Sequence, residues 1–197
     1  PARFCVKRLP RSTNGRVARA DHIRCFVALD LPKAFGEEAV RIQERLRGLG
    51  LFQGKFTAPQ NIHLTLKFLG EITRDQADRV RDGLRDINET TREVRLEGAG
   101  MFAPRIIWLK LTGANTLQKR VDASLSNWFA SEPQFMGHIT IARVKTAHNP
   151  RRLADTVREL EVAPVSGQAI SFSLRRSILN PEGPKYEVLK QFDLTDE

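Results

Sequence analysis

Two short stretches, His63-Leu64-Thr65-Leu66 and His138-Ile139-Thr140-Ile141, repeat one pattern of histidine, apolar residue, threonine and apolar residue. Each lies in a segment rich in β-branched and apolar residues, which predicts a strand. Successive side chains of a strand point to opposite faces, so the histidine and threonine of each stretch share one face. The imidazole and the hydroxyl then lie about 6.5–7 Å apart along one surface. The repeat therefore predicts two matching half-sites.

Strand and helix signals alternate through the rest of the chain. Strands are predicted over residues 23–30, 62–68, 94–102, 106–111, 138–144, 169–179 and 186–194, and helices over 37–48, 73–87, 115–129 and 150–161. The order β-α-β-α-β-β-α-β-α-β-β favours an α+β fold with a mostly antiparallel sheet and helices packed outside. No flexible linker interrupts residues 23–197, so we expect one folded domain there.

The composition is that of an ordinary globular chain: 197 residues, 41% hydrophobic and 28% charged. No apolar run approaches the roughly 20 residues that span a bilayer, which argues against a membrane protein. The sequence opens without an apolar stretch of signal-peptide length, so secretion is not expected. Cys5 and Cys25, the two cysteines, suit neither a disulfide scaffold nor a cysteine metal site. We expect a cytoplasmic protein.

The formal net charge of +9 suggests a polyanionic partner, but it is unevenly distributed. Residues 1–22 carry six basic side chains against one acidic side chain, leaving a surplus of four for residues 23–197. Residues 1–22 also lack a sustained strand or helix period, which predicts a flexible basic arm before the folded domain. Such an arm would add salt-sensitive affinity for RNA.

Two imidazoles and two hydroxyls suit displacement at phosphorus. A histidine with a pKa of about 6.5 can be a base or an acid at neutral pH, so a pair can supply one of each. Threonine hydroxyls can donate hydrogen bonds to the non-bridging oxygens of a phosphate. Two facing His-x-Thr strands would supply these groups without a metal or another cofactor.

Two rival types of site remain open from the residues alone. Paired histidines could bind zinc if an Asp or Glu completed the ligand set, although no third histidine shares their setting. A Ser-His-Asp hydrolase is less favoured, because the chain has no Gly-x-Ser-x-Gly motif.

The two motifs resemble those of the two-histidine phosphoesterase superfamily, and more closely those of the RNA 2′,3′-cyclic phosphodiesterases, historically called 2′-5′ RNA ligases. The resemblance extends over about residues 23–195, and its blocks are residues 24–32, 61–71, 138–144 and 183–189. It implies a bilobal α+β domain over residues 23–197. Two mostly antiparallel sheets would face each other across a central cleft, with one motif in each lobe and helices packed outside.

The resemblance also implies metal-independent hydrolysis of a terminal 2′,3′-cyclic phosphate to a 2′-phosphomonoester. His63 would be the general acid that protonates the 3′ leaving oxygen, and His138 the base that activates water. Thr65 and Thr140 would bind the phosphate. The expected partners are RNA ends or nucleotides bearing a 2′,3′-cyclic phosphate, with no membrane partner, and the protein is expected to be a monomer.

Two other functions fit the same fold. The chain could be an RNA end-binding module or a 2′-5′ RNA ligase with incidental hydrolysis. It could also act on small cyclic nucleotides rather than on RNA ends.

Arg143 and Tyr186 are the further candidates for substrate binding. Arg143 lies five places after His138, so strict alternation would put it on the opposite face, whereas a bulge would turn it toward the phosphate. The arginine of the resembling family favours the second arrangement. Tyr186, the only tyrosine, could stack on a base, donate a hydrogen bond at the cleft, or pack within a hairpin.

Several other residues are expected to have structural roles. Phe26, Phe68 and Phe102 are expected in the core rather than as platforms for bases. Lys67 is expected at the surface, although its parity with His63 would allow a phosphate contact. The doublet Arg175-Arg176 is expected in solvent, where it could also guide an RNA backbone.

The chain departs from the family pattern in three places. The basic residues 1–22 have no counterpart, and the stretch between Trp128 and His138 is shorter than expected. Met136-Gly137 stands where the family often has Pro or Ala. These differences bear on cleft width and substrate preference more than on the chemistry.

Overall fold

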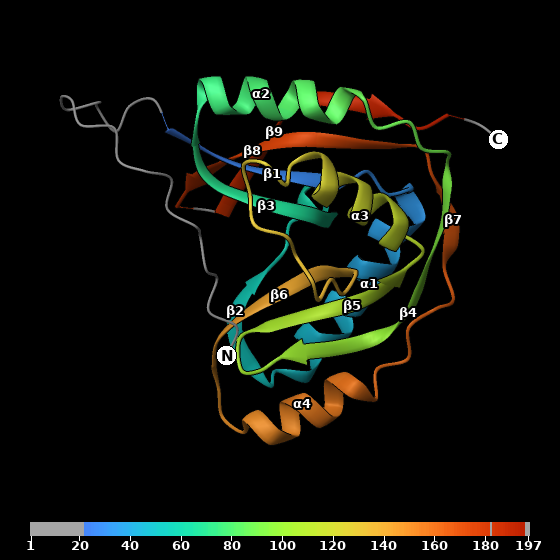
Figure 1. The fold of residues 1–197 in the computed structure, drawn as a ribbon. Helices are drawn as coiled ribbons and strands as arrows, with labels where there is room; N and C mark the ends of the chain where they lie inside the picture. The colour runs from blue at the N-terminus through green and yellow to red at the C-terminus, as the bar shows by residue number, and fades with distance from the viewer. Residues whose placement is uncertain (1–21, 182, 196–197) are drawn as a thin grey trace.

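The computed structural model describes residues 22–181 and 183–195 (Figure 1). The predicted basic arm therefore lies outside the described residues, apart from His22, which begins the first strand. In chain order the elements are β1 (His22–Leu29), α1 (Lys33–Leu49), β2 (Phe52–Phe56), the 3₁₀ turn η2 (Pro59–Asn61), β3 (Leu64–Thr73), α2 (Arg74–Arg85), β4 (Arg92–Phe102), β5 (Ile106–Thr112), α3 (Asn115–Ser124), β6 (His138–Ala147), α4 (Pro150–Arg158), β7 (Ser166–Ala169), β8 (Ser171–Asn180) and β9 (Gly183–Asp193).

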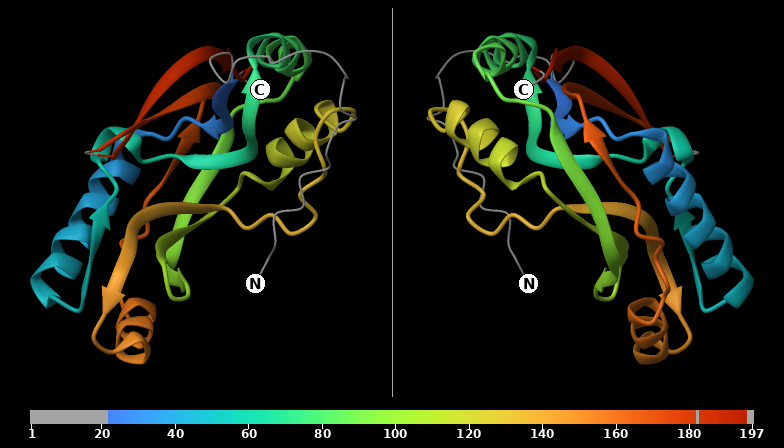
Figure 2. Two further views of the ribbon diagram at one scale, coloured as in Figure 1. Left: turned by 90° about the vertical axis from the view of Figure 1, so that its left-hand side faces the viewer. Right: turned by 90° about the vertical axis from the view of Figure 1, so that its right-hand side faces the viewer.

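The strands of the described chain form one curled antiparallel sheet (Figure 2). Its order is β7-β4-β5-β6-β3-β1-β8-β9, and β2 pairs with β6 off this path. The α+β class is confirmed. The two predicted sheets are two halves of one sheet, because a single residue pair, Leu64 with Ile139, joins β3 to β6. We call β1, β3, β8 and β9 the His63 half, and β2, β4, β5, β6 and β7 the His138 half.

The helices cover the outside of the two halves (Figure 1). Helix α2 contacts β1, β3 and β9, and α3 contacts β3, whereas α4 contacts β4 and α1 contacts β6. Helix α1 shows how a helix packs on the sheet. Its apolar residues Phe35, Ala39, Ile42 and Leu46 recur at helical spacing and are at most 1% exposed. Burying a large apolar side chain contributes roughly 1.5–3 kcal/mol, so this face fixes the helix on the sheet. Gly50 ends α1 in the left-handed conformation.

Helix α3 is shorter than the sequence predicts. It ends at Ser124 instead of continuing to residue 129, so Trp128 lies beyond the helix and is 39% exposed. The hydroxyls of Ser124 and Ser126 donate to the carbonyls of Val121 and Ala123. Serine side chains compete in this way for backbone groups, which favours turns over a continued helix.

Strand β2 lies where the sequence predicts neither a strand nor a helix. Only its end residues, Phe52 and Phe56, are apolar, so its sequence lacks a strand period. Its middle residue, Gly54, packs against β6 so closely that a Cβ there would lie 2.2 Å from the carbonyl oxygen of Arg143. Pairing with an established strand, rather than local propensity, thus makes β2 a strand.

The structure bears on two expectations from composition. None of the helices in the described part of the chain is long and apolar enough to cross a membrane. Cys25 is a free, buried thiol, and burial raises its pKa to about 11. It therefore stays protonated at neutral pH and is a poor nucleophile. Cys5 lies outside the described residues.

Candidate active site

A single cross-strand pair brings the two motifs together. Leu64 of β3 pairs with Ile139 of β6 in antiparallel register, and both side chains are fully buried. Each is the residue between the histidine and threonine of its motif. The antiparallel register therefore sets His63 on the side of Thr140, and Thr65 on the side of His138. Because alternate side chains share a face, all four polar groups lie on the face opposite the core.

Strand β3 carries a one-residue bulge directly after its threonine. Thr65 pairs with Ala28 of β1, whereas Lys67 pairs with the next residue back, Val27, so Leu66 is the extra residue. A bulge of this kind reverses the alternation of side chains beyond it. Lys67 therefore turns away from the face of His63.

Strand β6 carries the same bulge at the matching position. Thr140 pairs with Trp108 of β5, whereas Ala142 pairs with Ile107, so Ile141 is the extra residue. Beyond the bulge, the fifth residue after the histidine returns to the face of the histidine. The two motifs thus repeat in backbone geometry as well as in sequence.

The bulge in β6 brings Arg143 to the active-site face. Arg143 pairs with Ile106 on β5 and with Lys55 on β2. The charge of Arg143 lowers the pKa of Tyr186, against burial, which is the larger effect and raises that pKa. Arg143 and Tyr186 therefore interact electrostatically, although they belong to different halves of the sheet. Of the two arrangements open from sequence, the structure has the one with the bulge.

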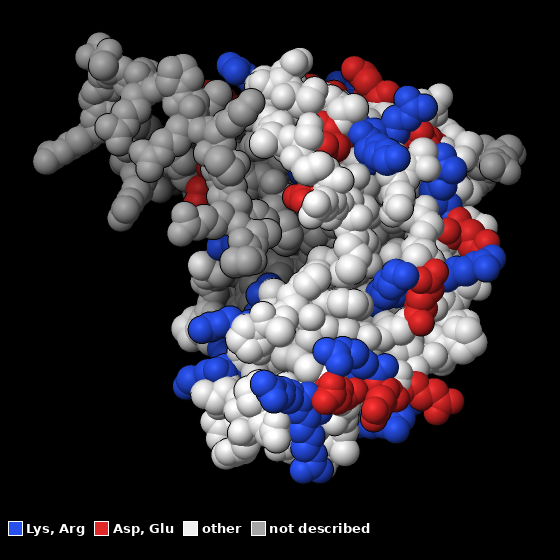
Figure 3. Space-filling view, turned by 60° about the horizontal axis from the view of Figure 1, so that its bottom comes forward, with Lys and Arg blue, Asp and Glu red and all other residues white. Residues whose placement is uncertain are grey.

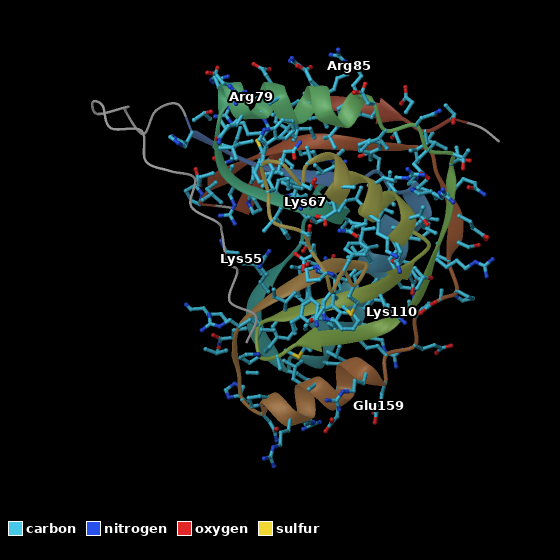
Figure 4. All side chains as sticks on the ribbon, in the orientation of Figure 1. Lys55, Lys67, Arg79, Arg85, Lys110 and Glu159 are labelled. Atoms are coloured by element: carbon cyan, nitrogen blue, oxygen red, sulfur yellow. The ribbon has the colours of Figure 1, made fainter. Side chains whose placement is uncertain are left out.

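The bulge in β3 overturns two expectations. Lys67 was expected in solvent or on the phosphate, but it is 5% exposed, and its Nζ donates to the Asp122 carboxylate and to the Ala130 carbonyl (2.8 Å) (Figure 4). Phe68 was expected in the core, but the reversed alternation leaves it 58% exposed. Its ring lies 6.3 Å from that of Phe26.

Phe102 also differs from expectation, whereas Phe26 is buried as expected. Phe102 is 41% exposed, and its ring meets that of His138 edge-on, at 5.0 Å and 89°. Phe26 is buried, but its ring lies 4.9 Å from the rings of His63 and Tyr186 rather than in the main core. Period-2 patterns identify which residues share a face, but they do not say which face is the core.

His63 is held by hydrogen bonds on both sides of its ring. Its Nδ1–H donates to the Asn61 carbonyl at 2.6 Å, because a carbonyl can only accept. The Asn61 side chain in turn donates to the Pro184 carbonyl at 2.6 Å, which ties this loop to β9. The other ring nitrogen, Nε2, lies 3.0 Å from the Thr65 hydroxyl. The Tyr186 ring packs edge-on at 5.1 Å.

The environment of His63 favours the neutral imidazole. Burial lowers its pKa to about 4, and the positive charges of Arg175 and His138 act in the same direction. The hydrogen bond to Asn61 and the charge of Asp30 oppose the shift. At neutral pH His63 is therefore uncharged in the free protein, and its Nε2 accepts a hydrogen bond from the Thr65 hydroxyl.

His138 has a matching anchor but a freer Nε2. Its Nδ1–H donates to the Met136 carbonyl at 2.8 Å, and burial lowers its pKa despite this bond. The preceding residue, Gly137, packs against β5: the Leu111 N–H donates to its carbonyl at 2.9 Å, and a Cβ would lie 2.3 Å from the Leu111 oxygen. Within the described residues, no hydrogen bond joins the ring to Thr140, so the half-sites differ.

The described structure places all six predicted site residues around one face, at the junction of the two halves. Sequence reasoning missed Asn61, which positions His63; its only signal was its place two residues before the motif. Within residues 22–181 and 183–195, no three or more His, Cys, Asp and Glu side chains are grouped to hold a metal ion. Lys and Arg side chains stand among Asp and Glu side chains on the face shown in Figure 3.

Comparison with known proteins agrees with this fold. Residues 29–108 match the family model described as LigT like Phosphoesterase. The solved structure of TT0787 from Thermus thermophilus has a TM-score of 0.73 and 28% identity, covering 89% of this chain and 100% of that one. The apo structure of E. coli LigT has a TM-score of 0.72 at 23% identity, over 89% and 99% of the two chains, and shares the fold. Fold and site together define a LigT-like phosphoesterase.

Sequence relatives give the narrower assignment. A Methanothermobacter thermautotrophicus protein named RNA 2′,3′-cyclic phosphodiesterase is 33% identical over 87% of this chain and 99% of its own length. A Thermus thermophilus protein of the same name is 35% identical over 89% and 92%. The chain belongs to the family of RNA 2′,3′-cyclic phosphodiesterases, and it is an enzyme of the phosphoric diester hydrolase class.

Proposed function

We propose that the enzyme hydrolyses a terminal 2′,3′-cyclic phosphate of RNA to a 2′-phosphomonoester, without a metal ion. The observation that carries this proposal is the Leu64–Ile139 pair, which sets two imidazoles and two hydroxyls on one face in antiparallel register. This arrangement can flank one phosphate with an acid and a base. The names of the sequence relatives support the choice of substrate.

The reaction is an in-line displacement. His138 Nε2 takes a proton from water, whose oxygen attacks the phosphorus as the bond from phosphorus to O3′ breaks. His63 gives its Nε2 proton to O3′, which leaves a free 3′-hydroxyl and a 2′-phosphomonoester. His138 then releases its proton to solvent, and His63 takes up a proton from solvent. Thr65, Thr140 and Arg143 donate hydrogen bonds to the phosphate oxygens, and Tyr186 borders the nucleotide.

The bond between His63 and Thr65 links substrate binding to protonation. In the free protein the Thr65 hydroxyl donates a hydrogen bond to His63 Nε2. Once His63 is protonated, its Nε2 no longer accepts, so the Thr65 hydroxyl can donate to a phosphate oxygen instead. The negative charge of the phosphate raises the pKa of His63, opposing the burial that lowers it. The substrate thus helps to create its own general acid.

A substrate with sulfur in place of O3′ distinguishes the general acid from the general base. His63→Ala and His138→Ala should each reduce hydrolysis of an oligonucleotide with a 2′,3′-cyclic phosphate at least 10³-fold, in line with the loss of an acid or base. Sulfur in place of O3′ leaves as a thiolate and needs no acid, so it should restore much of the activity of His63→Ala only. Restoration of His138→Ala instead would reverse the assignment, and restoration of both or neither would contradict it.

Two further tests separate the alternatives. Activity should persist in excess EDTA, and its loss on chelation would contradict the metal-free mechanism. Multiple turnovers to the 2′-phosphate should occur; tight binding without conversion would favour an RNA end-binding module or a ligase.

We also propose that the enzyme acts as a monomer, because one chain supplies both half-sites. Sedimentation at the assay concentration tests this.

A further inference from the structure

Polar side chains continue the His63 half of the site across three strands. Cross-strand pairing joins Arg24 of β1 to Ser177 of β8, and Ser177 to Tyr186 of β9. These three side chains therefore form one row on one face of the sheet. Arg175 lies two residues before Ser177 on β8, so it shares that face. We call Arg24, Arg175, Ser177 and Tyr186 the β8 strip.

The β8 strip begins at the ring of His63. Arg175 pairs with Phe26 of β1, whose ring lies 4.9 Å from that of His63. The Tyr186 ring lies 4.9 Å from that of Phe26 and 5.1 Å from that of His63. The row of Arg24 and Ser177 is the next one on the same face, about 6.5–7 Å further along the strands.

Arg175 is fixed in place by a small, partly buried network of hydrogen bonds. Its Nη2 donates to the Asp30 carboxylate at 2.5 Å, and its Nε donates to the Ser173 hydroxyl at 2.9 Å. The hydroxyls of Ser171 and Ser173 each donate to Asp30 at 2.8 Å. The guanidinium is therefore ordered before any ligand binds, which lowers the entropy cost of using it.

Asp30 compensates the charge of Arg175, so within the described chain Arg24 supplies the unpaired positive charge of the strip. Glu71 faces Arg24 from β3, yet among the described residues Arg24 takes part in no ion pair. Arg176 points to the opposite face and pairs with Glu187 at 3.7 Å. The doublet expected in solvent is thus divided, with one arginine on each face. Arg24 and Arg175 also act electrostatically on the Tyr186 hydroxyl.

We propose that the β8 strip binds the phosphodiester that precedes the terminal nucleotide of the RNA. Guanidinium and hydroxyl groups are the donors that phosphate oxygens prefer in nucleic-acid complexes. The placement rests on the proposed function, in which His63 protonates O3′. That oxygen belongs to the terminal ribose, whose 5′ oxygen carries the preceding phosphodiester. The strip adjoins His63, so it lies on the side toward which the RNA chain continues. It would favour RNA ends over mononucleotides.

Binding measurements test the strip without requiring turnover. The probes are two dinucleotides ending in a 2′-phosphate, one with the ordinary phosphodiester and one with an uncharged methylphosphonate linkage. Calorimetric titration of the full chain at low salt should give a Kd about tenfold weaker for the methylphosphonate. Arg24→Gln should raise the Kd for the dinucleotide with the ordinary linkage about tenfold. It should leave the Kd for the methylphosphonate dinucleotide within twofold of the wild-type value. Ser177→Ala, which keeps the charge, should show the same pattern at about threefold.

Arg79→Gln on the exposed side of α2 (Figure 4) is the matched control, because it removes one charge from a helix whose buried side packs on the core face of the sheet, opposite the face of the strip. It should change neither Kd by more than twofold. The proposal is overturned if the wild type binds both linkages equally, or if the strip variants weaken both equally or neither. Failure of the proposed function would appear separately, as no hydrolysis of a 2′,3′-cyclic phosphate by a protein that still distinguishes the two linkages.

Discussion

At the scale of single residues, His63 and His138 differ although their motifs match. Both donate from Nδ1 to a backbone carbonyl two residues earlier, which leaves Nε2 of each ring for chemistry. His63 also faces Arg175, and its Nε2 bonds to Thr65. The sequence predicts the two histidines and threonines from their repeat. It cannot predict this asymmetry, because Arg175 lies on a strand distant along the chain, and because identical motifs do not show that only His63 bonds to its threonine.

The low pKa of His63 makes stability depend on pH. Its pKa is about 4 in the folded protein, against about 6.5 when unfolded. As the pH falls from 6.5 toward 4, the unfolded chain gains a proton that the folded protein does not, so His63 lowers the free energy of unfolding by up to about 3 kcal/mol. Urea titrations between pH 4 and 7 should show this loss, and His63→Gln should reduce it. An equal pH dependence in both proteins would contradict the shift.

The same environment sets the pH dependence of activity. Because kcat/KM reports the free enzyme, and the pKa of both histidines is lowered, its profile should peak below pH 6.5 and fall about tenfold per unit above that. The kcat profile should lie at higher pH, since bound phosphate favours the imidazolium. Rates on a mononucleoside 2′,3′-cyclic phosphate from pH 4.5 to 8 test this; a kcat/KM plateau extending to pH 8 would refute it.

At the scale of elements, two bulges decide which side chains reach the site. Strict alternation predicts Lys67 on the face of His63 and Arg143 away from that of His138. One extra residue in each strand reverses both predictions. Bulges depend on pairing with neighbouring strands, so the period of a single segment does not reveal them. The missed strand β2 has the same origin, because pairing with β6 creates it.

Gly137 allows β6 to approach β5 directly before His138. A Cβ there would lie 2.3 Å from the Leu111 carbonyl oxygen, so Gly137→Ala must displace the backbone. We expect a loss of about 1–3 kcal/mol in stability and a fall in kcat through displacement of His138. Thermal melting and steady-state rates measure both. Gly36→Ala in α1, where a Cβ has open space, is the control and should stabilise slightly. Wild-type behaviour of Gly137→Ala would show that this approach is not required.

The Lys67–Asp122 ion pair links β3 to helix α3. Asp122 also accepts the Glu132 N–H at 3.1 Å. Lys67→Met leaves this carboxylate without its buried partner, which should cost about 3–5 kcal/mol. Adding Asp122→Asn removes the charge and keeps the acceptor, so the double variant should regain part of that loss. Chemical denaturation of the wild type, the two single variants and the double variant measures the coupling, and strictly additive losses would contradict it.

At the scale of the whole molecule, the two halves of the sheet meet at one residue pair. The sequence predicts an α+β fold from the order of its elements, and the resemblance implies one motif in each lobe. Neither the sequence nor the resemblance predicts that Leu64 and Ile139 join the halves into one sheet, because these two residues lie far apart along the chain. The net charge of +9 was a poor guide to the site. The positions of Arg143, Arg175 and Arg24 on the active-site face say more about the site than the net charge of the chain does.

The most direct test of the central claim is the product formed in ¹⁸O-labelled water with excess EDTA. An RNA oligonucleotide ending in a 2′,3′-cyclic phosphate should be converted to the 2′-phosphate with one ¹⁸O atom in the phosphoryl group, as read by ³¹P NMR and mass spectrometry. The His63→Ala and His138→Ala variants should yield almost none. A 3′-phosphate product, a requirement for added metal, or full conversion by either variant would contradict the two-histidine mechanism.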